Sequence, residues 1–218
     1  HYAQLVLALN KNEGSYATTD TKPKFWANWR EVHDVSDAVR AAVNSPVRAE
    51  EHAKLFKGLF AFARADFEEQ AMDGREPTGQ DYLLWSLCRP ERLIEIARQF
   101  ILYDEGGAVK KVARYQQYFA IRSTIERVRQ RDRNGRRKGG VIWQTQGSGK
   151  SLAMVLLGKA LALEKSIPNA RIVIVTDRID LDEQIWKTFH QCGKDPEQAK
   201  TGPHLVGLRK NPHASVIT

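Results

Sequence analysis

The stretch that decides the fold covers residues 139–154 and has the sequence GGVIWQTQGSGKSLAM. An apolar run at residues 141–143 leads into a glycine-rich turn, and Lys150 and Ser151 follow that turn. Apolar residues then recur at helical spacing as far as Leu163. A buried strand, a glycine-rich turn and a helix beginning with Lys-Ser form the context of a phosphate-binding loop. We therefore predict a nucleotide site here.

Each residue type in the turn has a chemical task. Gly147 and Gly149 permit a tight backbone turn that aims N–H groups at phosphate oxygens, at the positive end of the following helix. Lys150 brings a positive charge to the outer phosphates and is our candidate catalytic residue, while the Ser151 hydroxyl is a candidate ligand of Mg²⁺. The loop residues predicted to bind the nucleotide are Gln146, Gly147, Ser148, Gly149, Lys150 and Ser151.

The loop departs from the general pattern G-x-x-x-x-G-K-[ST] at one position, because Gln144 stands where the first glycine is expected. Superfamily 2 helicases and translocases relax that position. The departure therefore argues against small kinases and GTPases more than against nucleotide binding.

Composition indicates a globular protein with an anionic partner. The 218 residues are 42% hydrophobic and 28% charged, with a net charge of +8. That balance favours nucleic acid first and an anionic membrane surface second. No apolar run approaches the ~20 residues of a membrane span, so we expect no membrane association. Cys88 and Cys192 lie far apart without a C-x-x-C pattern, which predicts reduced structural thiols in a cytoplasmic protein.

The two ends of the chain suggest a piece of a longer protein. The chain starts at His1 without a methionine and stops inside the apolar run at residues 216–218. We expect further domains on both sides.

Residues 1–108 predict helices without a catalytic cluster. Residues 5–9 form a short strand candidate, and the aromatic group Phe25, Trp26 and Trp29 indicates a small core patch, with base stacking as the alternative. Residues 34–47 predict a short helix or a linker. A helix over residues 49–72 would turn one apolar face inward, made of Leu55, Leu59, Phe60, Ala63 and Phe67.

Two shorter helices complete this part. One covers residues 81–87, and the second begins at Pro90 with a buried face of Leu93, Ile94, Ala97, Phe100 and Ile101. Residues 104–108 include two glycines and form the best candidate for a domain boundary.

The helix that starts after residue 110 and runs to about residue 131 carries a second candidate site. Residues 114–121 match the pattern R-x-x-Q-x-x-A-I that precedes the phosphate loop in superfamily 2 motors, and Gln117 occupies the glutamine position. An amide donates to and accepts from the adenine edge at once, which predicts ATP as the nucleotide. Gln116 is the fallback, and Tyr115 could stack on the base. The alternative is a surface glutamine pair on an amphipathic helix.

The next segment, residues 127–138 (RVRQRDRNGRRK), is strongly basic. Such runs are usually solvated faces or linkers, which is the interpretation we favour, with a DNA-backbone contact as the alternative.

Beyond the loop, the pattern predicts a parallel α/β layer. Residues 170–175 form an apolar, β-branched strand, and residues 179–190 a helix with three apolar side chains inward. With the strand at residues 141–143 this gives a right-handed βαβ unit and a RecA-like sheet. Residues 200–210 predict a polar turn region, and residues 214–218 a third strand.

Taken together, the motifs resemble the restriction (R) subunit of type I restriction enzymes. The stretches that carry the resemblance are ARYQQYFAI, WQTQGSGKSLAM and IVIVTDRIDLDEQI, although this chain has Gln144 where the family commonly has histidine. The resemblance is dense over residues 111–184 and thinner elsewhere. It implies three parts: the end of an α/β nuclease domain at residues 1–48, a helical connector at 49–108, and the N-terminal part of a RecA-like motor domain at 109–218.

The resemblance also implies an activity: an ATP-driven translocase on double-stranded DNA that carries an endonuclease and works with methylation (M) and specificity (S) subunits. By motif position, Thr176, Asp177 and Arg178 would touch DNA, Gln117 would contact adenine, and the loop would hold ATP and Mg²⁺. The nuclease residues and the carboxylates that complete the Mg²⁺ site are expected outside this chain. We therefore expect the chain alone to be inactive.

Two other functions stay open. One is a different superfamily 2 helicase or DNA-repair motor. The other is a non-catalytic nucleic-acid-binding module with a degenerate loop, whose salt-sensitive DNA binding would not depend on ATP.

Overall fold

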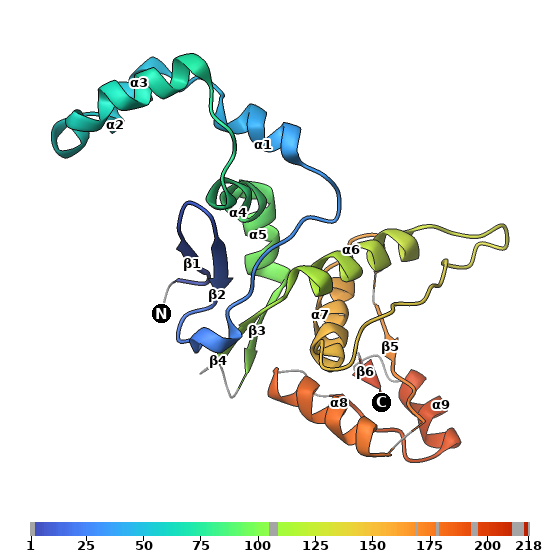
Figure 1. The fold of residues 1–218 in the computed structure, drawn as a ribbon. Helices are drawn as coiled ribbons and strands as arrows, with labels where there is room; N and C mark the ends of the chain where they lie inside the picture. The colour runs from blue at the N-terminus through green and yellow to red at the C-terminus, as the bar shows by residue number, and fades with distance from the viewer. Residues whose placement is uncertain are drawn as a thin grey trace. The chain divides into compact units, whose positions relative to one another are not determined.

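The computed structural model of the chain describes residues 3–104, 109–168, 170–177, 179–192, 196–210 and 216–217 (Figure 1). The structure is α/β, with many helices and three two-stranded sheets among the described residues. The chain divides into two compact units. The α4 unit comprises residues 7–15 and 28–93, and the α7 unit comprises residues 1–6, 16–27 and 94–218. Within the described ranges, no helix has the length and apolar character needed to cross a membrane.

The α4 unit is mainly helical, and α1 packs on the helix α4 that gives the unit its name. Its helices are α1 (Ser36–Val43), α2 (Ala49–Leu55), η2 (Gly58–Ala63), α3 (Arg64–Asp73) and α4 (Gly79–Cys88). Val39 of α1 is buried, as are Leu83 and Leu87 of α4. Strands β1 (Val6–Leu9) and β2 (Gly14–Ala17) form a two-stranded sheet, which confirms the strand predicted at residues 5–9.

Gly79 lets the turn between β1 and β2 approach the start of α4. A Cβ atom at this position would lie 2.1 Å from the backbone oxygen of Asn12, which is too close for any side chain. Thr78 caps the same helix end, and its hydroxyl lies 3.4 Å from the amide nitrogen of Asp81.

The prediction of one long helix over residues 49–72 is wrong. The chain forms α2, η2 and α3 instead: α2 ends at Leu55, and Gly58, with a φ of +68°, is the first residue of η2. A residue in the left-handed region cannot continue a right-handed α-helix, so α2 cannot extend through Gly58. The predicted inward face is exposed, most clearly at Leu59, whose exposed fraction is 80%.

Helix α5 (Pro90–Gln99) begins at the predicted proline, but its buried residue is Ile96 rather than Leu93 or Ile94, which are exposed. Phe100 and Ile101 are fully buried, as predicted, although they lie beyond the helix at the entry to the next strand. The short helix η1 (Pro23–Phe25) precedes Trp26, whose indole donates to the backbone oxygen of Thr21 at 2.9 Å.

The α7 unit contains the larger core. In chain order its elements are β3 (Ile101–Asp104), β4 (Val109–Val112), α6 (Tyr115–Arg129), α7 (Lys150–Ala162), β5 (Ile172–Val173), α8 (Ile179–Gln191), α9 (Gly202–Lys210) and β6 (Val216–Ile217). Helices α6 and α7 pack on each other, and α7 packs on α8. The fully buried side chains at these contacts include Tyr118, Ile121, Val155, Leu156, Ile185 and Phe189.

Two contacts shape this core. Gly158 of α7 faces Ile172 of β5 and Phe189 of α8, and a Cβ there would lie 3.3 Å and 3.5 Å from their side chains. The ring of Tyr118 packs against that of Phe100 in a tilted arrangement with 4.6 Å between centroids. The close approach of helix to helix and helix to strand therefore depends on the glycine.

The strands around residues 104–108 pair with each other. β3 and β4 are antiparallel, with Ile101 opposite Val112 and Asp104 opposite Val109. Contacts thus run across the predicted domain boundary, and residues on both sides of it, from Ile94 onward, belong to the α7 unit. Residues 109–112, which were expected to lead directly into a helix, form β4, and α6 starts at Tyr115.

A parallel pair is present, but not where the first strand was predicted. β5 and β6 are parallel, with Ile172 opposite Val216 and Val173 opposite Ile217, and α8 and α9 lie between them in the chain. This confirms strand formation within residues 170–175 and 214–218. The segment 200–210 contains α9, so the predicted turn region is wrong there.

The strand predicted at residues 141–143 is not formed. Val141 is 92% exposed and Trp143 is 90% exposed. A parallel strand is stable only when a neighbour takes up its backbone hydrogen bonds, and no strand among the described residues pairs with this segment. The βαβ unit predicted from residue 141 is therefore absent from the described structure.

We predict that Leu156→Ala lowers the free energy of unfolding of the α7 unit by about 2–5 kcal/mol, because Leu156 is fully buried between helices. The control is Leu163→Ala at the end of α7, where the side chain is half exposed. Urea unfolding followed by circular dichroism measures both. Equal losses in the two variants would contradict the described packing.

The α4 unit should lose stability in acid through Asp81. Its carboxylate accepts from Arg75 at 2.6 and 2.8 Å and from the Thr78 amide, and the Arg75 hydrogen bonds hold the pKa of Asp81 well below its usual range. A carboxyl group with a depressed folded pKa stabilises the fold above its unfolded pKa of about 4, and this contribution disappears as the pH falls further. We predict that Asp81→Asn removes part of the decline in unfolding free energy below about pH 4. Asp66→Asn, at an exposed carboxylate, should leave that decline unchanged, and an identical pH profile for both variants would refute the role of Asp81.

Candidate nucleotide site

The glycine-rich turn adopts the conformation that its glycines predict. Gly147 and Gly149 have φ values of +77° and +80°, in the left-handed region. The Ser148 amide and hydroxyl both donate to the backbone oxygen of Thr145, at 3.3 and 2.8 Å. α7 starts at Lys150, and its first backbone bond runs from Ala153 to Gly149 at 3.0 Å. The turn therefore ends at a helix N-terminus, as predicted.

Lys150 and Ser151 lie in the first turn of α7. The Lys150 ammonium is exposed and donates to the backbone oxygen of Thr145 at 2.9 Å, so the side chain folds back across the turn. Ser151 is half-buried beside it. A positive charge and a hydroxyl thus stand together where the unpaired N–H groups of a helix start point outward.

Gln117 joins the start of α6 to this turn. Its side-chain nitrogen donates to the backbone oxygens of Ser148 at 3.1 Å and Gly149 at 3.2 Å. Its side-chain oxygen accepts from the Arg114 amide at 3.0 Å, and only 3% of the residue is exposed. A Cβ atom on Gly149 would lie 2.8 Å from this amide nitrogen. The glutamine and the glycine therefore require each other.

Sequence reasoning placed Gln117 near the loop but missed this bridge. The signal that could have revealed the bridge is the spacing of a capping box, because Gln117 lies three residues after Arg114, the N-cap residue of α6. Gln116 is exposed, and Tyr115 is half-buried. Of the two glutamines, only Gln117 reaches the turn, which favours it over the predicted fallback.

The residues of the turn are compatible with a nucleoside triphosphate. A Cβ on Gly147 would meet nothing within 4 Å, so the space beside this residue is open to a ligand, and the exposed lysine supplies the opposite charge. Among the described residues there is no group of three or more His, Cys, Asp or Glu that could hold a metal ion. Mg²⁺ at this site would therefore rely on the Ser151 hydroxyl and on phosphate oxygens, which is its usual habit with nucleotides.

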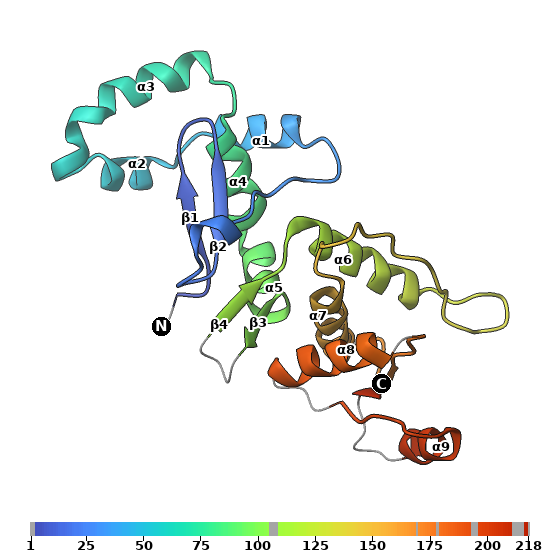
Figure 2. The ribbon, with the colours of Figure 1, turned by 60° about the horizontal axis from the view of Figure 1, so that its bottom comes forward.

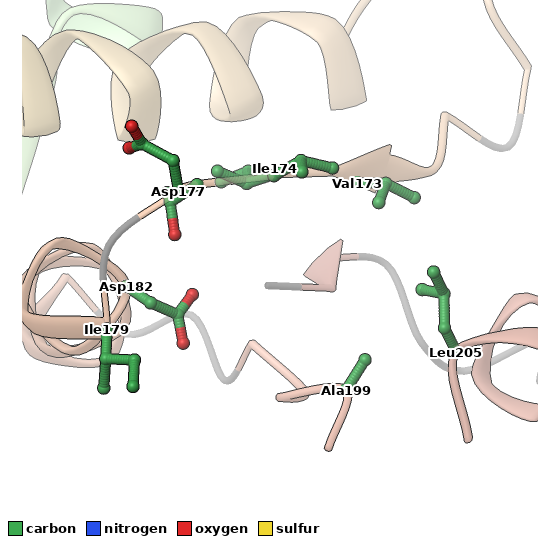
Figure 3. A pocket seen from close by; sticks show the side chains of 9 residues that line it. Val173, Ile174, Asp177, Ile179, Asp182, Ala199 and Leu205 are labelled. Atoms are coloured by element: carbon green, nitrogen blue, oxygen red, sulfur yellow. The ribbon is translucent and has the colours of Figure 1, made fainter. Parts of the chain in front are cut away.

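The residues predicted to touch DNA lie at a different place. Thr176 and Asp177 follow β5 and line a cavity of about 350 Å³, together with Asp182 and Leu205 (Figure 3). In Figure 3 the carboxylate of Asp182 points into this space, and it accepts from Gln198 at 2.9 Å. Arg178 lies outside the described residues. The carboxylates would repel a phosphate, so only Thr176 offers a suitable group among the described members of the predicted set.

The comparisons with known proteins agree with the predicted resemblance. The SWI2/SNF2 ATPase family matches residues 116–218. The HindI endonuclease subunit of a type I restriction enzyme from Haemophilus influenzae is 39% identical over 135 residues, which is 58% of this chain and 13% of that protein. A protein from Methanocaldococcus jannaschii, provisionally named as the type I restriction enzyme MjaIXP endonuclease subunit, is 30% identical over 148 residues, 66% of this chain and 14% of that protein.

A third relative, the type I restriction enzyme SauCOLORF180P endonuclease subunit of Staphylococcus aureus, is 26% identical over 109 residues, 50% of this chain and 11% of that protein. The chain thus spans about an eighth of the length of the curated relatives it matches. The resemblance to the restriction subunits of type I enzymes, together with a SWI2/SNF2-type ATPase segment, is confirmed.

We predict that Gln117→Ala weakens the binding of ATP and of GTP by about tenfold each, because the turn loses the hydrogen bonds that hold its conformation, and a loss equal to about one hydrogen bond, ~1.4 kcal/mol, corresponds to about tenfold in Kd. A larger loss of affinity for ATP than for GTP would measure a contact between Gln117 and adenine. Gln116→Ala, one position earlier on the exposed side, is the matched control. The binding of fluorescent nucleotides to the chain is the measurement, and unchanged GTP binding by Gln117→Ala would contradict the bridge.

Proposed function

We propose that this chain, a relative of type I restriction endonuclease subunits, is the ATP-binding part of a motor that moves double-stranded DNA. The observation that carries the proposal is the position of Lys150, at the start of α7 and directly after two left-handed glycines, the second of which accepts a hydrogen bond from Gln117. This arrangement lies within the segment that matches SWI2/SNF2 ATPases. The relatives' names support DNA cleavage as the purpose of the complete subunit.

In this proposal each loop residue has one role. Backbone N–H groups of residues 146–149 bind phosphate oxygens, and the Lys150 ammonium leaves Thr145 to neutralise the outer phosphates, which makes it the catalytic residue of this segment. Ser151 holds Mg²⁺, which when bound neutralises charge on the phosphates. Gln117 contacts adenine by exchanging one of its present hydrogen bonds, since its amide oxygen and nitrogen are both engaged.

The remaining assignments follow the resemblance. Residues 109–218 would form the N-terminal part of a RecA-like motor lobe, residues 49–108 a helical connector, and residues 1–48 the end of the nuclease domain. DNA would pass near Thr176, Asp177 and Arg178, and the complete cytoplasmic subunit would assemble with methylation and specificity subunits. The carboxylates that activate water for ATP hydrolysis would come from outside this segment.

We predict that Lys150→Ala in the complete subunit, assembled with its partners, reduces DNA-stimulated ATP hydrolysis by at least a hundredfold, the range seen when a preorganised charge is removed from a transition state. Lys165→Ala, which removes an exposed lysine shortly after the other end of α7, is the matched control.

The measurement is ATP turnover with and without linear duplex DNA that carries an unmodified recognition site. Turnover by Lys150→Ala equal to that of Lys165→Ala would reject the proposed nucleotide site. Turnover that DNA does not stimulate in the unmodified protein would reject the motor and leave a different superfamily 2 enzyme.

A further inference from the structure

Most of the net charge of the chain is concentrated in one short segment. Residues 127–138 contain seven arginines and lysines and a single acid, Asp132, so they carry +6 of the chain's net +8. The segment lies between α6 and the glycine-rich turn, in the α7 unit. The proposed nucleotide site uses none of these residues.

Two arginines of this run, Arg129 and Arg137, are bound within the structure. Arg129 pairs with Glu164, which follows α7, at 2.7 Å, and this hydrogen bond lowers the pKa of Glu164 to about 2. Arg137 donates to the backbone oxygens of Val128 at 3.0 Å and Ser166 at 2.8 Å. These bonds attach Arg129 and Arg137, which we call the base of the basic run, to the ends of α6 and α7. Because α7 begins at Lys150, the base is fixed about 20 Å along the same helix from the nucleotide site.

Residues 130–138 form a hairpin-like turn, which we call the basic hairpin. Arg131 and Arg137 face each other as an antiparallel bridge, the Lys138 amide donates to Gln130 at 3.0 Å, and the Asp132 amide donates to Arg136 at 2.8 Å. Gly135, with a φ of +74°, makes the reversal. In both views the segment that follows α6 projects away from that helix and from α7 (Figures 1 and 2).

The only acidic residue of the hairpin, Asp132, accepts hydrogen bonds from backbone amides of the turn itself. The Asp132 carboxylate accepts from the amides of Asn134 and Arg136, both at 2.9 Å. Arg131 donates to the backbone oxygen of Gly135 at 2.6 Å and remains exposed. Arg133 and Arg136 are exposed and form no ion pair within the described part of the chain. The tip therefore presents guanidinium groups to solvent on an ordered backbone.

We propose that the basic hairpin is a contact site for the phosphate backbone of double-stranded DNA. Guanidinium groups bind phosphate in a bidentate manner, and an ordered turn loses little conformational freedom on binding. Residues 129–138 contain no apolar side chain that could anchor in a lipid surface, which favours nucleic acid over a membrane. The choice of duplex DNA rests on the proposed function.

The site differs from the predicted DNA residues after β5, and it explains why a basic run precedes the nucleotide loop. DNA bound at the tip of the hairpin would be connected, through Arg129 and Arg137, to the ends of α6 and α7. Both helices begin at the proposed nucleotide site. Contacts made with the backbone alone are independent of base sequence, which suits a protein that moves along DNA.

The test compares two double variants of the intact chain. Arg133→Gln/Arg136→Gln removes two exposed charges of the tip, neither of which belongs to an ion pair within the described residues, and Arg30→Gln/Arg98→Gln removes two exposed charges elsewhere. The affinity for a fluorescent 20-bp duplex is measured by anisotropy as a function of salt. We expect the slope of log K against log[salt] to become shallower by about 1.8 in the tip variant, at about 0.9 per lost phosphate contact, and to stay unchanged in the control.

A tip variant with the slope and affinity of the control would overturn the proposal, as would an unmodified chain that does not bind the duplex. Tip-dependent binding to phosphatidylserine vesicles, without such binding to DNA, would also overturn it. Fluorescent ATP binding separates this inference from the proposed function: the tip variant should bind ATP normally, whereas Lys150→Ala should lose ATP and keep the salt slope for DNA.

Discussion

The side-chain amide of Gln117 is the interaction on which the candidate site depends. A buried amide must have its hydrogen-bonding groups satisfied, and here the partners are the Arg114 amide and the carbonyls of Ser148 and Gly149. The same bonds fasten the start of α6 to the start of α7. Gly149 must remain a glycine because its left-handed conformation and the approaching amide leave no room for a side chain. One buried side chain thus holds the end of the glycine-rich turn against the start of α6.

Helix α7 carries this geometry into the rest of its unit. Its first turn holds Lys150, its middle packs through Gly158 against β5 and α8, and residues just beyond its end anchor the base of the basic hairpin. A rigid helix therefore connects three places: the loop proposed to bind ATP, the parallel strands, and the surface proposed to bind DNA. This is the layout expected of a protein in which nucleotide binding and DNA contact influence each other, although coupling itself requires two states of the helix.

The elements that were predicted correctly are those whose signal is local. The glycine turn, α7 and α8 depend on residue types and on helical spacing that lie within a few turns of one another. The strand predicted at residues 141–143 is not formed in the structure. Strand formation depends on a partner segment, which the local sequence does not specify. The prediction of one helix over residues 49–72 is wrong for a related reason. The apolar period suits a long helix, but the left-handed Gly58 prevents α2 from continuing, and the apolar face is exposed. The Gln117 bridge joins residues 31 positions apart, so only the fold reveals it.

The most direct measurement is amide hydrogen exchange of the chain with and without ATP and Mg²⁺. Our account predicts that the nucleotide slows exchange at residues 146–151 and at the first turn of α6, because phosphate oxygens occupy the loop amides and adenine contacts Gln117 at the start of α6. Exchange in the α4 unit should not change. Protection confined to other segments, or no protection at saturating ATP, would contradict the central claim that this turn is a nucleotide site.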